Sequence, residues 1–386
     1  MAIHIIAEAL SKGIPGISNK WKILWFALCF TLIGIVKWFS TGISNTSERK
    51  LHGKIIMITG GTSGIGAAAV LSLAQRGAQI ILLVHQPPND LFLIDFIGDL
   101  REKSGNELIY AEQVDLSSLY SIRKFATKWI DNAPPRRLDM IILCAATLTP
   151  PGKQRTLTEE GLEEMWMVNY LCNYHLLSIL SPAIRAQPPD RDVRIIFTTC
   201  SSYSSSPPIK DYPTFLKNWA PSKSYAQSKL ALTIFAQSFQ KHLSAYQRPD
   251  GAPMNARVII VNPGYTRTPG MRRWLSRGTF WGLGMYIVLW EFAWLFLKCS
   301  EDGAQSLLYA AMEASLSRGP GGKFIKECKE VKPERSELTD DAAGKKLWEG
   351  SEILVEATEK KILAKQSSKK KMKKKEIDSM KGFCST

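Results

Sequence analysis

Histidine and cysteine are scarce in this 386-residue chain, with five of the first and seven of the second. The cysteines are dispersed and include no CxxC pair. An odd and dispersed set of cysteines argues against both a disulfide framework and a structural zinc site. We therefore predict that the chain has no metal site and resides in a reducing compartment.

Acidic residues are too few to balance the basic ones, and the formal net charge is +15. Residues 360–381 hold ten lysines against Glu376 and Asp378, so this one segment carries +8 of that charge. Surfaces that bind single-stranded nucleic acid combine basic groups with aromatic stacking platforms, which the segment does not offer. We predict no nucleic-acid partner and interpret residues 331–386 as a polar, lysine-rich, partly disordered tail. Attraction to anionic lipid head groups is an alternative role for the lysines.

Long apolar runs are uncommon, and residues 21–39 form the clearest one, with Lys22 and Lys37 near its ends. A bilayer core requires about twenty apolar residues, and lysines near the ends of such a helix can reach the interface. No small-residue cleavage pattern follows, so we predict an uncleaved membrane anchor within an N-terminal segment of residues 1–50. A buried amphipathic helix is the alternative.

A second apolar run, residues 280–297, is rich in aromatic residues but contains Glu291. An ionisable group at the centre of a bilayer is costly, which argues against a second span. Tryptophan favours the depth of the lipid head groups. We expect this segment either to lie in the membrane interface or to pack on the folded domain as a lid.

Short apolar runs alternate with helical patterns from residue 51 onward. Continuous apolar strands that alternate with helices are typical of a parallel sheet covered on both faces. We therefore predict an α/β fold, a Rossmann-type doubly wound parallel sheet, over residues 51–330. The apolar runs that we expect as strands are residues 54–58, 79–84, 140–143, 193–197 and 258–261.

Three glycines follow the first expected strand in the pattern Gly60-x-x-x-Gly64-x-Gly66, directly before a helical stretch. Glycines let the backbone approach a pyrophosphate closely, and the N-terminus of the helix offers free N–H groups. This strand–turn–helix context predicts a dinucleotide-binding turn. A tight turn without a ligand is the alternative.

Tyr225 and Lys229 are four residues apart in a predicted helix. Side chains at this spacing share a face, so a phenol and an ammonium can address one pocket. A phenol with a pKa of about 10 is a poor acid–base group at neutral pH, but a nearby ammonium favours the phenolate. The pair is therefore a candidate for proton transfer.

In this order, the motifs resemble the short-chain dehydrogenase/reductase family over roughly residues 51–326. The resemblance implies four catalytic residues, Asn169, Ser202, Tyr225 and Lys229, of which Asn169 holds a water in a proton relay. It also places Asp115 beside the adenine ring of the cofactor. The remaining cofactor-binding residues that it implies are Gly60, Ser63, Gly64, Ile65, Gly66, Ala145, Tyr225, Lys229, Pro263, Gly264, Thr266 and Thr268.

Further matches favour one branch of that family. The stretch from Tyr225 to Leu232, the sequence Glu301-Asp302-Gly303-Ala304-Gln305-Ser306 and the later Gly321-Gly322-Lys323-Phe324 are similar to retinol-dehydrogenase-like and polyprenol dehydrogenases. The resemblance implies hydride transfer between a nicotinamide cofactor and the alcohol or carbonyl of a lipophilic substrate. It also implies a membrane location, with the endoplasmic reticulum or a lipid droplet expected, and allows a homodimer.

Two departures from the family pattern affect the expected site. The family's NNAG sequence reads Leu143-Cys144-Ala145-Ala146 here, and the position of the catalytic serine is open among Cys200, Ser201 and Ser202. We favour Ser202, because a hydroxyl donates a hydrogen bond better than a thiol does. A catalytically impaired, membrane-tethered scaffold that binds NADP(H) is the alternative function.

The expected cofactor preference rests on the end of the second strand. A carboxylate there would bind the ribose 2′-hydroxyl of NAD(H) and repel the 2′-phosphate of NADP(H). The sequence Val84-His85-Gln86 has no carboxylate, and the nearest is Asp90, beyond two prolines. NADP(H) is therefore favoured over NAD(H). His85 is either a phosphate contact or an ordinary surface histidine.

Overall fold

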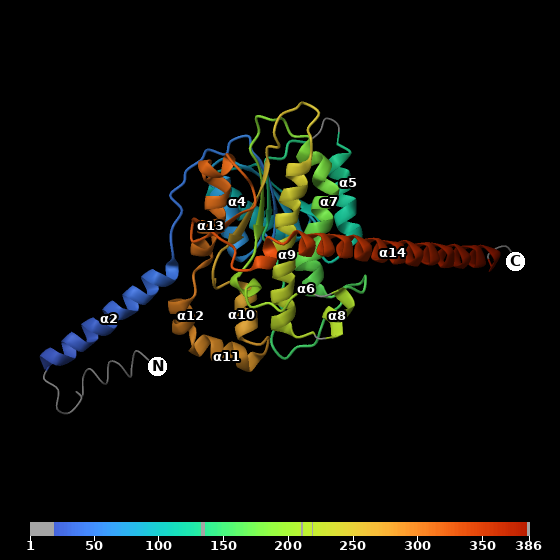
Figure 1. Ribbon diagram of the computed structural model, residues 1–386. Helices are drawn as coiled ribbons and strands as arrows, with labels where there is room; N and C mark the ends of the chain where they lie inside the picture. Colours follow the sequence, from blue (N-terminus) through green and yellow to red (C-terminus); the bar gives the residue numbers. More distant parts are fainter. Residues whose placement is uncertain (1–18, 133–135, 210, 218, 384–386) are drawn as a thin grey trace.

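The computed structural model describes residues 19–132, 136–209, 211–217 and 219–383 (Figure 1). Its centre is an eight-stranded sheet in the order β3-β2-β1-β4-β5-β6-β7-β8, with every pair parallel except β7 and β8. The predicted Rossmann-type parallel sheet is confirmed. The strands are β1 (Ile55–Thr59), β2 (Gln79–Val84), β3 (Ile109–Gln113), β4 (Met140–Leu143), β5 (Val193–Thr198), β6 (Ala256–Asn262), β7 (Lys323–Lys326) and β8 (Lys329–Val331).

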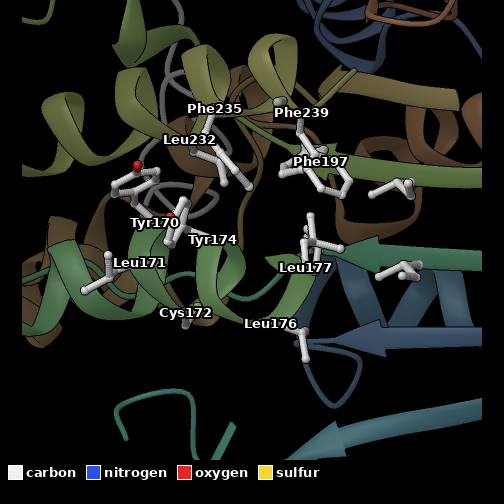
Figure 2. Packing of buried hydrophobic residues seen from close by; sticks show 14 of the residues in the cluster. Tyr170, Leu171, Cys172, Tyr174, Leu176, Leu177, Phe197, Leu232, Phe235 and Phe239 are labelled. Atoms are coloured by element: carbon white, nitrogen blue, oxygen red, sulfur yellow. The ribbon is translucent and has the colours of Figure 1, made fainter. Parts of the chain in front are cut away.

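Helices cover both faces of the sheet, as continuous apolar strands require. One hydrophobic cluster joins the sheet to α3 (Gly64–Gln75), α4 (Leu91–Ser104) and α13 (Ser300–Met312). The other joins the opposite face to α5 (Leu119–Ile130), α7 (Cys172–Arg185) and α9 (Pro221–Ala245). Figure 2 shows this second cluster, where Tyr174 and Phe235 meet edge to face at 5.3 Å.

The strand order changes direction beside β1. From β1 the chain proceeds outward to β2 and β3 and then returns to add β4 on the other side. In doubly wound sheets the ligand crevice lies at the carboxyl ends of the strands at this switch point. The glycine turn after β1 and the Cys144-Ala145 segment after β4 both lie there. A Cβ on Gly60 would lie 2.7 Å from the Cα of Ala145, which shows how closely the two segments approach.

Two apolar segments lie outside the sheet and its covering helices. Helix α2 (Asn19–Thr41) contains residues 21–41, which are long and apolar enough to cross a membrane, and none of that span is buried. The first eighteen residues of the predicted N-terminal segment lie outside the described residues. The aromatic run predicted at residues 280–297 forms two short helices, α11 (Phe280–Val288) and α12 (Trp290–Phe296), after α10 (Pro269–Leu275).

The C-terminal part differs from the expectation of a polar tail that starts at residue 331. The helix α14 (Asp341–Phe383) packs its first turns against α9. Leu347 and Val355 are buried there, and Trp348 meets Tyr174 at 5.5 Å. The packed unit therefore extends well beyond residue 330, because widely spaced apolar residues within the polar segment fall on one helical face. Beyond these turns α14 runs out of the body, on the side opposite α2 (Figure 1).

Candidate active site

A cavity of about 900 Å³ lies over the carboxyl ends of the central strands. The glycine turn, the ends of β4, β5 and β6, and one face of α9 line it, together with apolar side chains of α10, α11 and α12. Asn169 and Asp115 are the two predicted site residues that do not line the cavity. The predicted residues that do are Gly60, Ser63, Gly64, Ile65, Gly66, Ala145, Ser202, Tyr225, Lys229, Pro263, Gly264, Thr266 and Thr268.

The glycine turn is built for close backbone approach. A Cβ on Gly66 would lie 2.0 Å from the carbonyl oxygen of Gly60, so no larger residue fits there without a shift of the backbone. Gly60 and Gly64 have φ values of +67° and +55°, which glycine adopts at little cost. Ser63 is the N-cap of α3, and within the described chain its side chain accepts no capping hydrogen bond. The N–H groups at this helix start therefore remain suited to a phosphate.

Tyr225 and Lys229 lie one turn apart on α9 and face the cavity. The Lys229 ammonium lies 5.9 Å from the centre of the Tyr225 ring and donates a 3.1 Å hydrogen bond to the carbonyl oxygen of Thr198, at the end of β5. Burial raises the pKa of Tyr225 well above 10 and lowers the pKa of Lys229 below 10.5. The phenol is therefore protonated at neutral pH and can act as a proton donor.

Three residues after β5 were candidates for the catalytic serine. The Cys200 thiol is 3.7 Å from the Tyr225 hydroxyl, and the Ser202 hydroxyl is 2.7 Å from the same thiol. The Ser201 hydroxyl accepts a 3.1 Å hydrogen bond from the Asn262 amide at the end of β6. Cys200 thus contacts Tyr225 directly, Ser202 adjoins that pair through the Cys200 thiol, and Ser201 is hydrogen-bonded to Asn262 instead.

Asn169 lies in a π-helical turn, Met167–Leu171, and is fully buried. Its side-chain oxygen accepts a 2.7 Å hydrogen bond from the Thr147 N–H, and its amide donates to the Thr147 carbonyl and the Ser228 hydroxyl, both at 3.0 Å. Ser228 in turn donates to the backbone carbonyl of Tyr225. Asn169 therefore links the loop after β4 to the helix that carries Tyr225, while its predicted role in a water relay stays a prediction.

Asp115 lies at the end of β3, away from the reaction centre. Its carboxylate accepts hydrogen bonds from the Ser117 N–H and hydroxyl at 2.8 and 2.7 Å. His85, after β2, lies 3.4 Å from the same carboxylate. Asp115, predicted beside the adenine ring, therefore shares one corner of the sheet with His85, for which a phosphate contact and an ordinary surface position were both left open.

Thr59 performs a task that the sequence analysis did not assign. Its hydroxyl accepts hydrogen bonds from the backbone N–H groups of Cys144 and Ala145 at 3.2 and 3.3 Å. This threonine therefore joins β1 to the end of β4, where the sequence of this chain differs from the family's NNAG. The only signal in the sequence was its place as the first residue of the glycine motif.

The short chain dehydrogenase family model matches residues 54–277, more than half of the chain. The chain belongs to the short-chain dehydrogenase/reductase family. It is an oxidoreductase of the retinol-dehydrogenase-like branch, and it is 43% identical over 381 residues to the uncharacterized oxidoreductase pbr1 of Schizosaccharomyces pombe, covering 97% of this chain and 99% of that one. It is also 30% identical to mouse retinol dehydrogenase 13, covering 84% and 91% of the two chains.

A solved structure of an uncharacterized protein from Mycobacterium paratuberculosis shows the same fold. Its TM-score is 0.56 at 21% sequence identity, and the match covers 82% of this chain and 98% of that one. The family binds nicotinamide cofactors, and the glycine turn provides the close backbone approach that a pyrophosphate needs. A bound nicotinamide supplies or accepts a hydride, so this chain's residues must bind it and handle the proton.

Proposed function

We propose that the protein is a membrane-associated enzyme that transfers a hydride between NADP(H) and the carbonyl or alcohol of a lipophilic substrate. Lipid, retinoid-like, polyprenoid and steroid-like compounds fit this description. The observation that carries the proposal is the lining of the cavity. Tyr225 and Lys229 line one part of it, and apolar side chains of α10, α11 and α12 line another part. A polar centre beside an apolar chamber suits a molecule with one oxygen function and a large hydrocarbon part.

The roles of the residues follow from the changes at the substrate when a carbonyl is reduced. The carbonyl oxygen gains negative charge and then a proton, and Tyr225 is placed to give that proton. Lys229 holds a positive charge beside the phenol, which stabilises the phenolate that forms. Ser202 donates a hydrogen bond to the developing oxyanion, with Cys200 as the neighbouring alternative. Alcohol oxidation follows the same path in reverse.

The preference for NADP(H) is supported by the surroundings of the β2 end. Asp90, the nearest carboxylate along the chain, accepts a 3.0 Å hydrogen bond from the Leu93 N–H as the N-cap of α4. It is thereby engaged as a helix cap. His85 is exposed at the same end, beside Asp115. What supports the proposed preference is that the β2 end itself, Val84-His85-Gln86, presents no carboxylate to a ribose 2′-hydroxyl.

Membrane association is supported by α2, whose apolar span of 21 residues is long enough to cross a bilayer. The name of mouse retinol dehydrogenase 13 also indicates a lipophilic substrate for that relative. We propose the membrane of the endoplasmic reticulum or of a lipid droplet as the location. A reducing compartment for the catalytic domain agrees with its free cysteines.

The test uses the purified full chain in mild detergent, with NADPH or NADH and two aldehydes that differ only in chain length. We expect NADPH to support turnover and the long-chain aldehyde to have a kcat/KM at least about tenfold higher, because each buried methylene stabilises the complex. A preference for the short aldehyde would refute the substrate class, and a preference for NADH would refute the cofactor. Binding of NADPH without turnover of any aldehyde or ketone would favour the scaffold alternative.

A further inference from the structure

The outer face of α11 and α12 is unusually apolar for a surface exposed to water. Phe280 and Trp281 are 94% and 92% exposed, and the rest of the face is also exposed. Soluble proteins rarely expose contiguous large apolar side chains over such an area, and those that do use them to bind a partner or a membrane. The further exposed members of this face are Met285, Ile287, Val288, Leu289, Trp290, Phe292, Trp294 and Phe296.

This face is continuous with the candidate membrane span. The Lys37 ammonium, near the end of α2, donates a 2.7 Å hydrogen bond to the carbonyl oxygen of Trp294 and lies 4.9 Å from the centre of its ring. A lysine within an apolar helix thus has a partner on α12. In Figure 1, α2 leaves the molecule beside α12, and α11 lies at the same end.

The segment that follows α2 is attached to the catalytic domain. The N–H of Ile43 donates to a Glu327 carboxylate oxygen at 3.2 Å, and the N–H of Asn45 donates to the Gln305 side-chain oxygen at 3.0 Å. These bonds fix the direction in which α2 leaves the domain. A bilayer that surrounds α2 therefore meets a defined face of the protein, and α11 and α12 lie on it.

Basic side chains border the apolar face. The Arg267 guanidinium lies 4.2 Å from the centre of the Trp290 ring, and Arg272, Arg273 and Arg277 are exposed along α10 and the turn that follows it. Residues 267–297 contain these four arginines and one acidic residue, Glu291. Tryptophan rings beside cationic groups are typical of the head-group region of anionic membranes.

The mouth of the catalytic cavity lies in this same face. Met285, Leu289 and Phe292 line the cavity and are also exposed to solvent. A molecule that enters between α11 and α12 therefore passes apolar side chains from the surface to the reaction centre. Water is a poor medium for such a molecule, whereas the acyl region of a leaflet is a good one.

We propose that α11 and α12 are immersed in the interface of the bilayer that α2 crosses, and that the substrate enters the cavity laterally from that leaflet. The occupant of the apolar face is lipid, and the arginines contact anionic head groups. The docking itself does not depend on the enzyme's reaction. The entry route rests on the proposed function.

The first experiment places the full chain in phosphatidylcholine–phosphatidylserine vesicles with or without acyl-brominated phosphatidylcholine, which quenches nearby tryptophan fluorescence. Each variant loses one tryptophan: W281F on the apolar face, and W129F as the control, whose ring is buried in the core. We expect W281F to remove a quenched component and W129F to remove an unquenched one. If Trp281 contributes only unquenched fluorescence, the docking is refuted, and a second copy of the chain becomes the occupant to examine.

The second experiment compares F280D/W281D with F92D on the full chain in the same vesicles. Phe92 is a matched control, since it is 86% exposed but lies on α4, away from α11 (Figure 1). We expect F280D/W281D alone to lower the turnover of a vesicle-dissolved long-chain aldehyde by about tenfold, with a short soluble aldehyde unaffected. Equal turnover in both variants refutes the entry route. A wild-type chain without turnover refutes the proposed function, and the quenching result still decides the docking.

Discussion

Replacing Tyr225 with phenylalanine removes one hydroxyl, which we expect to contribute little to the free energy of unfolding and much to the reaction rate. In the folded protein, this oxygen accepts a hydrogen bond from the Cys200 thiol at 3.7 Å. A sulfur donor at this distance is weak, so we expect the free energy of unfolding to fall by less than about 1 kcal/mol. The ring and its contact with Lys229 remain. The variant should therefore fold and bind NADPH as the wild type does.

The reaction, in contrast, loses its proton donor. A positioned general acid contributes roughly 10²- to 10⁴-fold to the rate, equivalent to about 3–5 kcal/mol in the activation free energy. We expect kcat for aldehyde reduction in Tyr225→Phe to fall within this range while the affinity for NADPH, measured by its fluorescence, changes by less than about threefold.

Tyr170→Phe is the matched control, because the Tyr170 hydroxyl is also buried but bonds to Ser351 on α14 at 2.6 Å. We expect it to lower thermal stability by about 1 kcal/mol and to leave kcat unchanged. Undiminished turnover in Tyr225→Phe would refute the assignment of the proton donor. An equal loss of NADPH affinity and turnover would instead give the hydroxyl a role in cofactor binding.

The pH dependence of reduction provides a further check on the same pair. Reduction needs the proton on Tyr225 and the charge on Lys229, and burial lowers the pKa of Lys229 below 10.5. The rate of reduction should therefore decline as the pH rises through the lowered pKa of Lys229. A rate that rises with pH across the alkaline range would contradict these protonation states.

Three further predictions concern the neighbouring hydroxyl, an ion pair and the glycine turn. Ser202→Ala should lower kcat by about a hundredfold and Cys200→Ala by less than about tenfold; the reverse ranking would assign the hydrogen-bond donor to Cys200. Burial alone would raise the pKa of Asp139, but its hydrogen bonds, led by that from Arg137, lower it below 3.8. Asp139→Asn should therefore reduce the free energy of unfolding by about 3 kcal/mol at neutral pH in denaturant titrations, with the difference from wild type narrowing as the pH falls below 3.8. Gly66→Ala should weaken NADPH binding by about tenfold, measured by fluorescence titration, because its Cβ meets the backbone of the turn.

The central sheet was predictable because its strands are buried on both faces and so are continuous apolar runs. The strands towards the edges, β3, β7 and β8, are the exceptions. Tyr110 of β3 is exposed and that strand contains Glu112, while β7 and β8 are short and contain lysines. A strand that buries only one of its faces has few consecutive apolar residues, so a search for apolar runs does not find it. The packing of α14 was missed for a similar reason, because a few apolar residues such as Leu347 and Val355 are diluted by charged ones.

By itself, the sequence determined the family, the fold and the local motifs. The glycine turn and the Tyr225–Lys229 pair are recognisable because backbone geometry fixes which close neighbours share a turn or a helical face. The tertiary structure decided what depends on contacts between distant segments. It brought Thr59 to the end of β4, grouped Cys200 and Ser202 with Tyr225, and attached α12 to Lys37 of α2. These arrangements follow from how the strands and helices pack, and no local spacing encodes them.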